Sequence, residues 1–211
     1  MLCGAQSGSK GICSPCELQL PHQTLQCCPN CAIPVTQHET CGQCLKHPPA
    51  FTHTLAAFTY EFPVSSLVHS LKYGGNLTLA SILAEPLVIL ASKHRKPDLL
   101  IPMPLHRNRL RTRGFNQSME IARDISRKLD IPILDYGYER VLDTPPQAEL
   151  NLKQRADNIR GAFACTLDLT GLHIAIVDDV MTSGATINEL SKTLCAQGAE
   201  SVSAWVVARA L

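Results

Sequence analysis

Cysteine placement is the feature of this 211-residue chain that most restricts its fold, because eight of the ten cysteines fall within the first 44 residues. Those eight are Cys3, Cys13, Cys16, Cys27, Cys28, Cys31, Cys41 and Cys44. The N-terminus carries no apolar signal segment, so we expect a cytoplasmic protein whose clustered cysteines bind metal rather than form disulfides. A segment this short cannot bury enough apolar surface to fold alone, and a metal would have to hold it together.

Two CxxC units predict a structural zinc site. Cys28 and Cys31 form the first unit, and Cys41 and Cys44 form the second after an interval of nine residues. Each unit places two thiolates on one side of a tight turn, and together they complete a tetrahedral Zn²⁺ site. Four thiolates leave no open position, so this zinc would be structural rather than catalytic. The alternative is a reduced or redox-active cysteine loop, but the βαβ context of a thioredoxin-like motif is missing.

A second zinc site is less complete in the sequence. Cys13 and Cys16 form another CxxC unit, whereas Cys3 has no partner three residues upstream. A site built on these three cysteines would take Cys27, His22 or water as its fourth ligand. Without metal the three would be oxidation-prone thiols.

The chain divides into two regions near residue 48. Residues 1–48 are cysteine-rich, whereas strand-like and helix-like segments alternate through residues 49–211. The expected strands are 51–62, 99–101, 173–177 and 201–208, and the expected helices are 64–73, 77–93, 114–129 and 187–194. This order predicts an α/β domain with a mostly parallel sheet and helices on both faces. No apolar run reaches about 18 residues, so we expect no membrane span.

The most informative segment for function is the strand–loop–helix pattern around residues 173–195. A continuous apolar run leads directly into Asp178 and Asp179. The loop that follows consists of Thr182, Ser183, Gly184, Ala185 and Thr186. Small and hydroxyl residues at a helix N-terminus suit a phosphate, and adjacent carboxylates suit two sugar hydroxyls or a divalent cation. The plainer interpretation is an ordinary strand–loop–helix with a solvated acidic turn.

A basic stretch follows another predicted strand. Its four arginines occupy alternate positions, Arg107, Arg109, Arg111 and Arg113. In an extended backbone they would all point to one side, where guanidinium groups suit the phosphate oxygens of pyrophosphate or of a nucleic-acid backbone. The alternative is a solvated basic loop with a helix N-cap region. The net charge of the whole chain is only +1, which argues against a generic nucleic-acid coat protein.

Four apolar residues, two acids and the 182–186 loop resemble the phosphoribosyl-pyrophosphate (PRPP) motif of type I phosphoribosyltransferases. The resemblance implies that Asp178 and Asp179 are the catalytic-site carboxylates that contact the ribose hydroxyls. It also implies that Thr182 to Thr186 hold the 5′-phosphate of PRPP, which these proteins bind with Mg²⁺.

The segment P-x-P-L-H-x-x-R-L-R-x-R-G-F-N-Q at 102–117 resembles the ComF (ComFC/GntX-like) family. Residues 69–75, 143–147, 155–163 and 205–211 are similar to the same family. Its members have the phosphoribosyltransferase fold, are linked to DNA uptake in natural transformation, and often carry an N-terminal double zinc ribbon. The resemblance therefore implies a zinc-ribbon segment followed by a phosphoribosyltransferase-like domain.

Three functions are compatible with these motifs. The first is a PRPP-binding protein that handles incoming single-stranded DNA, with DNA-uptake or recombination proteins as partners. The second is an enzyme that transfers a 5-phosphoribosyl group from PRPP to an unidentified acceptor. The third is a PRPP-sensing regulator whose partner docks on the cysteine-rich segment. Residues 143–160 are a candidate for a mobile loop over the substrate, or for a surface linker, and a homodimer is possible.

Overall fold

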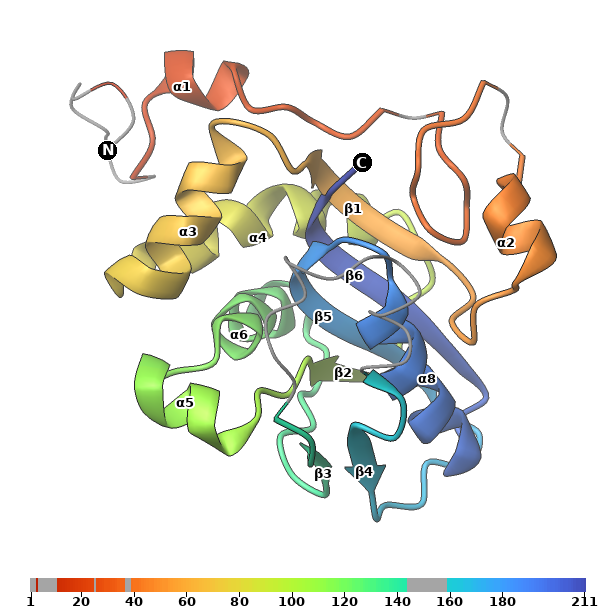
Figure 1. The fold of residues 1–211 in the computed structure, drawn as a ribbon. Helices are drawn as coiled ribbons and strands as arrows, with labels where there is room; N and C mark the ends of the chain where they lie inside the picture. Colours follow the sequence, from red (N-terminus) through yellow and green to blue (C-terminus); the bar gives the residue numbers. More distant parts are fainter. Residues whose placement is uncertain (1–2, 4–10, 25, 37–38, 144–158) are drawn as a thin grey trace.

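The computed structural model describes residues 3, 11–24, 26–36, 39–143 and 159–211. Its centre is a four-stranded sheet in the order β1-β6-β5-β2, with every neighbouring pair parallel (Figure 1). The strands are β1 (Thr54–Thr59), β2 (Leu99–Pro102), β5 (His173–Met181) and β6 (Ser201–Arg209). A separate antiparallel pair is formed by β3 (Tyr138–Arg140) and β4 (Phe163–Cys165).

Helices cover both faces of the sheet, as predicted. One face carries α3 (Val64–Gly74), α4 (Thr78–Ala91) and α6 (Gln117–Leu129), and the other carries α8 (Ala185–Ala196) (Figure 1). Alternation along β5 explains this arrangement, because successive side chains of a strand point to opposite faces. Ala175 and Val177 pack in the core with α3, α4 and α6, whereas Ile174 and Ile176 pack with α8.

Two elements differ from the sequence prediction in ways that affect the site. The predicted strand 173–177 continues to Met181, because Asp178 pairs with Val206 and Val180 with Ala208 of β6. The two acids therefore lie inside the carboxyl-terminal part of β5 rather than after it. The predicted helix 114–129 begins only at Gln117, where the Asn116 side chain accepts a hydrogen bond from the Ser118 N–H at 3.0 Å.

The cysteine-rich segment contains two short helices, α1 (Ser14–Leu18) and α2 (Gly42–Lys46), and it packs along β1 (Figure 1). The Gln23 N–H donates to the Ala57 carbonyl at 3.0 Å, and the Thr59 N–H donates to the Pro21 carbonyl at 2.8 Å. At the opposite edge of the sheet, the Leu134 N–H donates to the Leu100 carbonyl of β2 at 2.9 Å. The division between residues 48 and 49 remains a prediction. None of the helices that the structure describes is long and apolar enough to cross a membrane.

Candidate ligand site and metal clusters

The two predicted carboxylates lie together at the carboxyl end of β5, where ligands bind in open α/β sheets. Asp178 is 9% exposed and Asp179 is 3% exposed. One oxygen of Asp178 accepts hydrogen bonds from the Ser118 hydroxyl and from the Asp179 N–H, both at 2.9 Å. Burial and the neighbouring Asp179 charge raise the pKa of Asp178 to about 7, although Lys72 and these hydrogen bonds oppose the rise. The site therefore contains a carboxyl group that changes charge near neutral pH.

Lys72 completes this acidic pair. Its ammonium nitrogen is 2.7 Å from Asp179 Oδ2, and the two side chains are 22% and 4% exposed. Burial alone would lower the pKa of Lys72, but the Asp179 charge and hydrogen bond raise it above its ordinary value. Sequence reasoning did not assign Lys72 to the site, although it lies within the 69–75 segment that resembles the ComF family. It is carried there by α3, whose buried residues share a hydrophobic core with Ala175 and Val177 of β5.

The loop 182–186 connects β5 to the N-terminus of the twelve-residue helix α8. Thr182 is exposed, whereas Ser183 and Thr186 are half-buried. Gly184 has φ +77, and a Cβ at this position would lie 2.6 Å from Met181 Cε. A helix N-terminus carries partial positive charge and orients N–H groups toward an anion. The loop therefore lies at the N-terminus of α8 and next to the end of β5, and its role in phosphate binding stays a prediction.

Arg209, the last residue of β6, supports this loop from inside the protein. It is 3% exposed, and its Nη1 donates to the Met181 carbonyl at 3.1 Å and also to the carbonyls of Thr182 and Ala210. Its Nε donates to the Cys31 carbonyl at 2.7 Å. Burial lowers the pKa of Arg209, and the nearby cysteine sulfurs oppose that shift. Sequence reasoning did not identify this residue, since its partners lie far away along the chain.

The four predicted arginines lie on a helix, α5 (Arg107–Arg113), so they do not share one side as an extended segment would allow. The His106 side chain caps the start of α5, and Gly114 with φ +82 ends it. Alternate residues of a helix differ by about 200° in direction, whereas residues four apart lie on one face. The exposed pair consists of Arg107 and Arg111, and the half-buried pair consists of Arg109 and Arg113.

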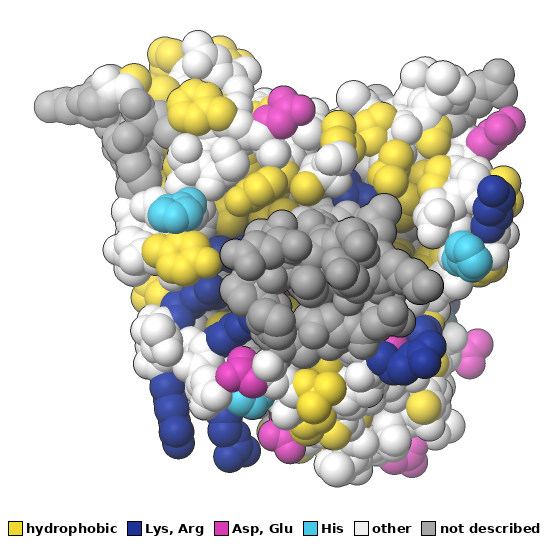
Figure 2. All heavy atoms as spheres, viewed as in Figure 1, with side chains coloured by type: hydrophobic (Ala, Val, Ile, Leu, Met, Phe, Trp, Pro, Cys, Tyr) yellow, Lys and Arg dark blue, Asp and Glu magenta, His cyan; other side chains and the backbone are white. Residues whose placement is uncertain are grey.

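The half-buried pair interacts with residues outside α5. Arg113 donates a hydrogen bond to Gln117 and lies 5.3 Å from the centre of the Tyr73 ring. Figure 2 shows Lys and Arg side chains gathered over α5 and beside α3 on this face. Arg140 of β3 adds a cation that the sequence did not reveal. It is buried, and burial and the Arg109 charge lower its pKa, while the charges of Asp178 and Asp143 oppose the shift.

The predicted mobile loop 143–160 falls mostly on residues 144–158, which lie outside the described part of the chain. Asp143 is described. One of its carboxylate oxygens accepts a hydrogen bond from Asn108 Nδ2 at 2.6 Å and lies 3.4 Å from His106 Nδ1. This contact joins the start of the predicted loop to α5.

Both predicted cysteine clusters are assembled. The sulfur atoms of Cys28, Cys31, Cys41 and Cys44 all lie within 4.8 Å of one another. A tetrahedral Zn–S distance of about 2.3 Å requires sulfur atoms about 3.8 Å apart, and Cys31 Sγ lies 3.6 Å from Cys41 Sγ. Burial opposes ionisation of Cys28, yet backbone N–H groups, including that of Cys41 at 3.3 Å, lower its pKa to about 7. Burial and neighbouring thiols raise the pKa of Cys44. Four thiols this close together, three of them buried and that of Cys41 half-buried, fit a metal cation.

The second cluster contains Cys3, Cys13 and Cys16, whose sulfur atoms also lie within 4.8 Å of one another. Cys3 Sγ is 3.4 Å from Cys13 Sγ. Within the described residues, neither suggested fourth ligand belongs to this group: the His22 ring packs 5.0 Å from the Phe58 ring, and Cys27 packs against the core. Three cysteines can thus bind a metal here with an external ligand.

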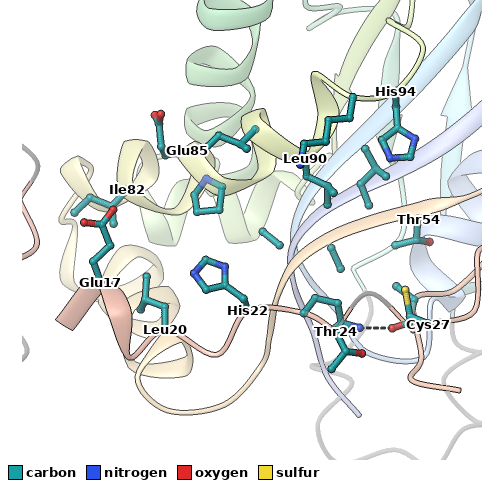
Figure 3. Close-up of a pocket in the computed structure, with 18 of the residues that line it drawn as sticks. Glu17, Leu20, His22, Thr24, Cys27, Thr54, Ile82, Glu85, Leu90 and His94 are labelled. Atoms are coloured by element: carbon teal, nitrogen blue, oxygen red, sulfur yellow. Dashed lines mark hydrogen bonds between the residues drawn. The ribbon is translucent and has the colours of Figure 1, made fainter. Parts of the chain in front are cut away.

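A cavity of about 1310 Å³ lies away from the predicted PRPP site, between the N-terminal segment, β1 and α4 (Figure 3). Its lining includes Leu20, His22, Ile82, Leu90 and His94. The lining includes His22 and Cys27, the two side chains suggested as a fourth ligand of the second cysteine cluster, but no residue predicted to bind PRPP.

Comparison with known proteins first identifies the class of protein to which this chain belongs. A family model described as the phosphoribosyl transferase domain matches residues 116–211, which include β5, the loop 182–186 and β6. The parallel sheet with helices on both faces agrees with this match. The fold and the site therefore define a protein with a phosphoribosyltransferase domain.

Relatives that match along nearly the whole chain identify the family. DNA utilization protein YhgH of Shigella flexneri is 34% identical over 211 residues, covering 97% of this chain and 92% of the relative. Competence protein F of Haemophilus influenzae is 33% identical over 211 residues, with 95% and 91% coverage. Competence protein ComFC of Bacillus subtilis is 24% identical over 212 residues, with 94% and 84% coverage. The chain belongs to the ComF family of competence and DNA utilization proteins.

Proposed function

We propose that this chain binds PRPP together with Mg²⁺ at the carboxyl end of β5, and that it handles incoming single-stranded DNA during natural transformation, in the cytoplasm. One observation carries the proposal: two buried carboxylates precede a hydroxyl-rich loop at the N-terminus of α8, in a chain of the ComF family. The relatives named for competence and DNA utilization support the biological part.

Each part of PRPP has a matching group in the site. Asp178 and Asp179 would accept hydrogen bonds from the two ribose hydroxyls. The backbone N–H groups and hydroxyls of residues 182–186 would hold the 5′-phosphate, with the positive end of α8 behind it. Carboxylate oxygens also suit Mg²⁺, which when bound would neutralise charge on the pyrophosphate.

Lys72 and three arginines are the groups suited to the pyrophosphate. A ribose hydroxyl at Asp179 would compete with the 2.7 Å contact from Lys72. Once released from Asp179, the Lys72 ammonium would remain beside the ligand and could contact a phosphate oxygen. Arg109, Arg113 and Arg140 supply further cations on this side of the carboxylates. Guanidinium groups are well suited to phosphate because they donate two parallel hydrogen bonds.

A second candidate function is transfer of the 5-phosphoribosyl group from PRPP to an unidentified acceptor outside DNA uptake. The match to the phosphoribosyl transferase domain favours it. In that reaction the bond from the anomeric carbon to pyrophosphate breaks, and a bond to the acceptor forms. The basic groups would stabilise the departing pyrophosphate, while Asp178 and Asp179 would position the ribose. Pyrophosphate release in the presence of an acceptor separates this function from binding alone.

The first experiment is calorimetric titration of the zinc-loaded protein with PRPP, with and without Mg²⁺. We expect micromolar binding that requires Mg²⁺ and that weakens at least tenfold in Asp179→Asn. Asp130→Asn is the matched control, because Asp130 is an exposed helix-capping residue at which Asn is equally suitable. The proposal fails if the folded protein does not bind PRPP, or if both variants bind it as the wild type does.

Single-stranded DNA binding is assigned to Arg107 and Arg111, because these two arginines of α5 are exposed. Each phosphate contact contributes about 0.7 to the slope of log affinity against log salt concentration for single strands. Replacing both with Gln should therefore reduce the slope by about 1.4 in fluorescence anisotropy with a labelled oligothymidine. The matched control is Arg123→Gln with Arg127→Gln, which changes the same charge on α6. An unchanged slope in the α5 variant would exclude this surface.

We also propose that Cys28, Cys31, Cys41 and Cys44 hold a structural Zn²⁺. Their sulfur atoms lie within 4.8 Å of one another, and the 3.6 Å between Cys31 and Cys41 is close to the spacing in a tetrahedral zinc site, which supports this assignment. Native mass spectrometry should find at least one zinc per chain. Detection of a second zinc would indicate that Cys3, Cys13 and Cys16 also bind zinc. A chain that folds without metal would refute the structural role of zinc.

A further inference from the structure

Arg209 joins two regions that have been described separately. From the end of β6 its Nε reaches the carbonyl of Cys31, within the first zinc-binding CxxC unit, at 2.7 Å. Its Nη1 reaches the carbonyls of Met181, at 3.1 Å, and Thr182, where the phosphate loop begins. One buried guanidinium therefore holds backbone atoms of both regions.

Thr54 of β1 makes a second connection between the same regions. Its N–H donates to the Pro29 carbonyl at 3.1 Å, and its hydroxyl donates to the Asn30 carbonyl at 2.5 Å. The same hydroxyl lies 3.9 Å from the sulfur of Met181. Met181 in turn fills the space beside Gly184 that a Cβ would need. Displacement of the Cys28–Cys31 turn would thus be transmitted to the 182–186 loop by two routes, through Arg209 and through Thr54.

Charge strengthens the connection through Arg209. Four thiolates with one Zn²⁺ carry a net charge of −2, and Arg209 is a buried cation beside them. The same cation holds the carbonyl oxygens of residues 181 and 182, so these oxygens point toward it and not toward an incoming phosphate. A lysine would keep the charge, but it lacks the planar fork that serves several acceptors at once.

We propose that Arg209 couples metal binding at the four-cysteine cluster to phosphate binding at residues 182–186, so that each ligand strengthens the binding of the other. Arg209 is a positioning residue in this scheme, because it contacts neither ligand. The coupling rests on the proposed function, which places a phosphate at the loop and zinc at the cluster. Linked binding is reciprocal, and couplings of this kind are typically of order 5- to 150-fold.

Zinc release measures the coupling without any enzymatic activity. Ribose 5-phosphate is the probe, because it carries the 5′-phosphate and needs no Mg²⁺, and the chelator is one that binds zinc but not Mg²⁺. A Cys13→Ser background removes the other cysteine cluster as a source of zinc. Saturating ribose 5-phosphate should slow zinc release about tenfold in this background and less than about twofold with Arg209→Lys added. Arg123→Lys, an exposed arginine on α6, should behave as the parent does.

The outcomes separate this inference from the proposed function. If the parent does not bind ribose 5-phosphate at all, the phosphate-loop assignment fails and the coupling fails with it. If the parent binds it without any change in zinc release, only the coupling is overturned. Equal slowing in Arg209→Lys and the parent would exclude Arg209 as the link. Should that variant not fold, Thr54→Val decides: partial loss of the slowing supports the connection, and full retention overturns it.

Discussion

Replacing Lys72 with Met should destabilise the protein far more than loss of an ordinary surface cation. The Lys72 nitrogen is 2.7 Å from Asp179 Oδ2, and Asp179 is almost fully buried. At an effective dielectric constant of about 20 the attraction is roughly 6 kcal/mol, before desolvation is subtracted. Removing one partner of a buried pair typically costs about 3–5 kcal/mol, because the other charge is left unpaired. Lys72 keeps 22% exposure, so we expect the lower end, about 3 kcal/mol.

Calorimetric melting of the zinc-loaded protein at neutral pH measures this loss. For a chain of this size, 1 kcal/mol shifts Tm by about 2–4 °C, so Lys72→Met should melt about 6–12 °C lower. Lys96→Met is the control, because Lys96 lies 3.7 Å from an exposed carboxylate and should contribute less than about 1 kcal/mol. Adding Asp179→Asn to Lys72→Met removes the unpaired charge and should restore part of the stability. Additive losses in the double variant, or a Lys72→Met cost below about 1 kcal/mol, would contradict the reasoning.

Three further predictions concern the glycine, the titrating carboxyl and the metal. Gly184→Ala should cost about 1–2 kcal/mol of stability because of the positive φ, and it should weaken PRPP binding about tenfold. The control is Gly171→Ala, since Gly171 has a φ of +74 but an added Cβ there would contact no neighbouring atom. This control should leave the PRPP affinity unchanged. PRPP affinity, followed by calorimetry, should rise about tenfold per pH unit up to about pH 7 and then level off. In the proposed complex a ribose hydroxyl would donate to ionised Asp178, and burial has raised the pKa of Asp178 to about 7. Asp178→Asn should remove that component of the pH profile, and a profile identical to that of the wild type would exclude Asp178 as its origin. Cys28→Ser should lower the zinc content by one per chain in native mass spectrometry, whereas Cys165→Ser, outside both clusters, should not change it.

Features that depend on neighbours along the chain could be predicted from the sequence. The spacing within Cys28–Cys31 and Cys41–Cys44 sets the geometry of each turn locally, and the four sulfurs are indeed together. Asp178 and Asp179 follow an apolar run, so their place at the end of a buried strand was predictable. Only the strand's extension to Met181 was missed, because pairing with β6 decides it.

Features that depend on distant contacts or on competing local signals were not predictable. Lys72 and Arg140 reach the site from elements far from β5 in sequence, and no local pattern marks them. The alternate positions of the four arginines predicted that their side chains would point to one side of an extended backbone. The His106 cap and the positive φ of Gly114 instead enclose one short helix, which separates exposed Arg107 and Arg111 from the other two arginines.

The hydrogen bonds between residues 21–23 and β1 affect the tendency of this protein to self-associate. A strand with an open edge can pair with the edge of another chain and so begin aggregation. Here the cover over β1 is supplied by the cysteine-rich segment, through contacts such as Gln23 N–H to the Ala57 carbonyl at 3.0 Å. If zinc holds this segment in place, as proposed above, a cell short of zinc would produce chains whose β1 edge is uncovered. We expect such chains to be lost to self-association, so that zinc supply would set how much of the protein remains usable.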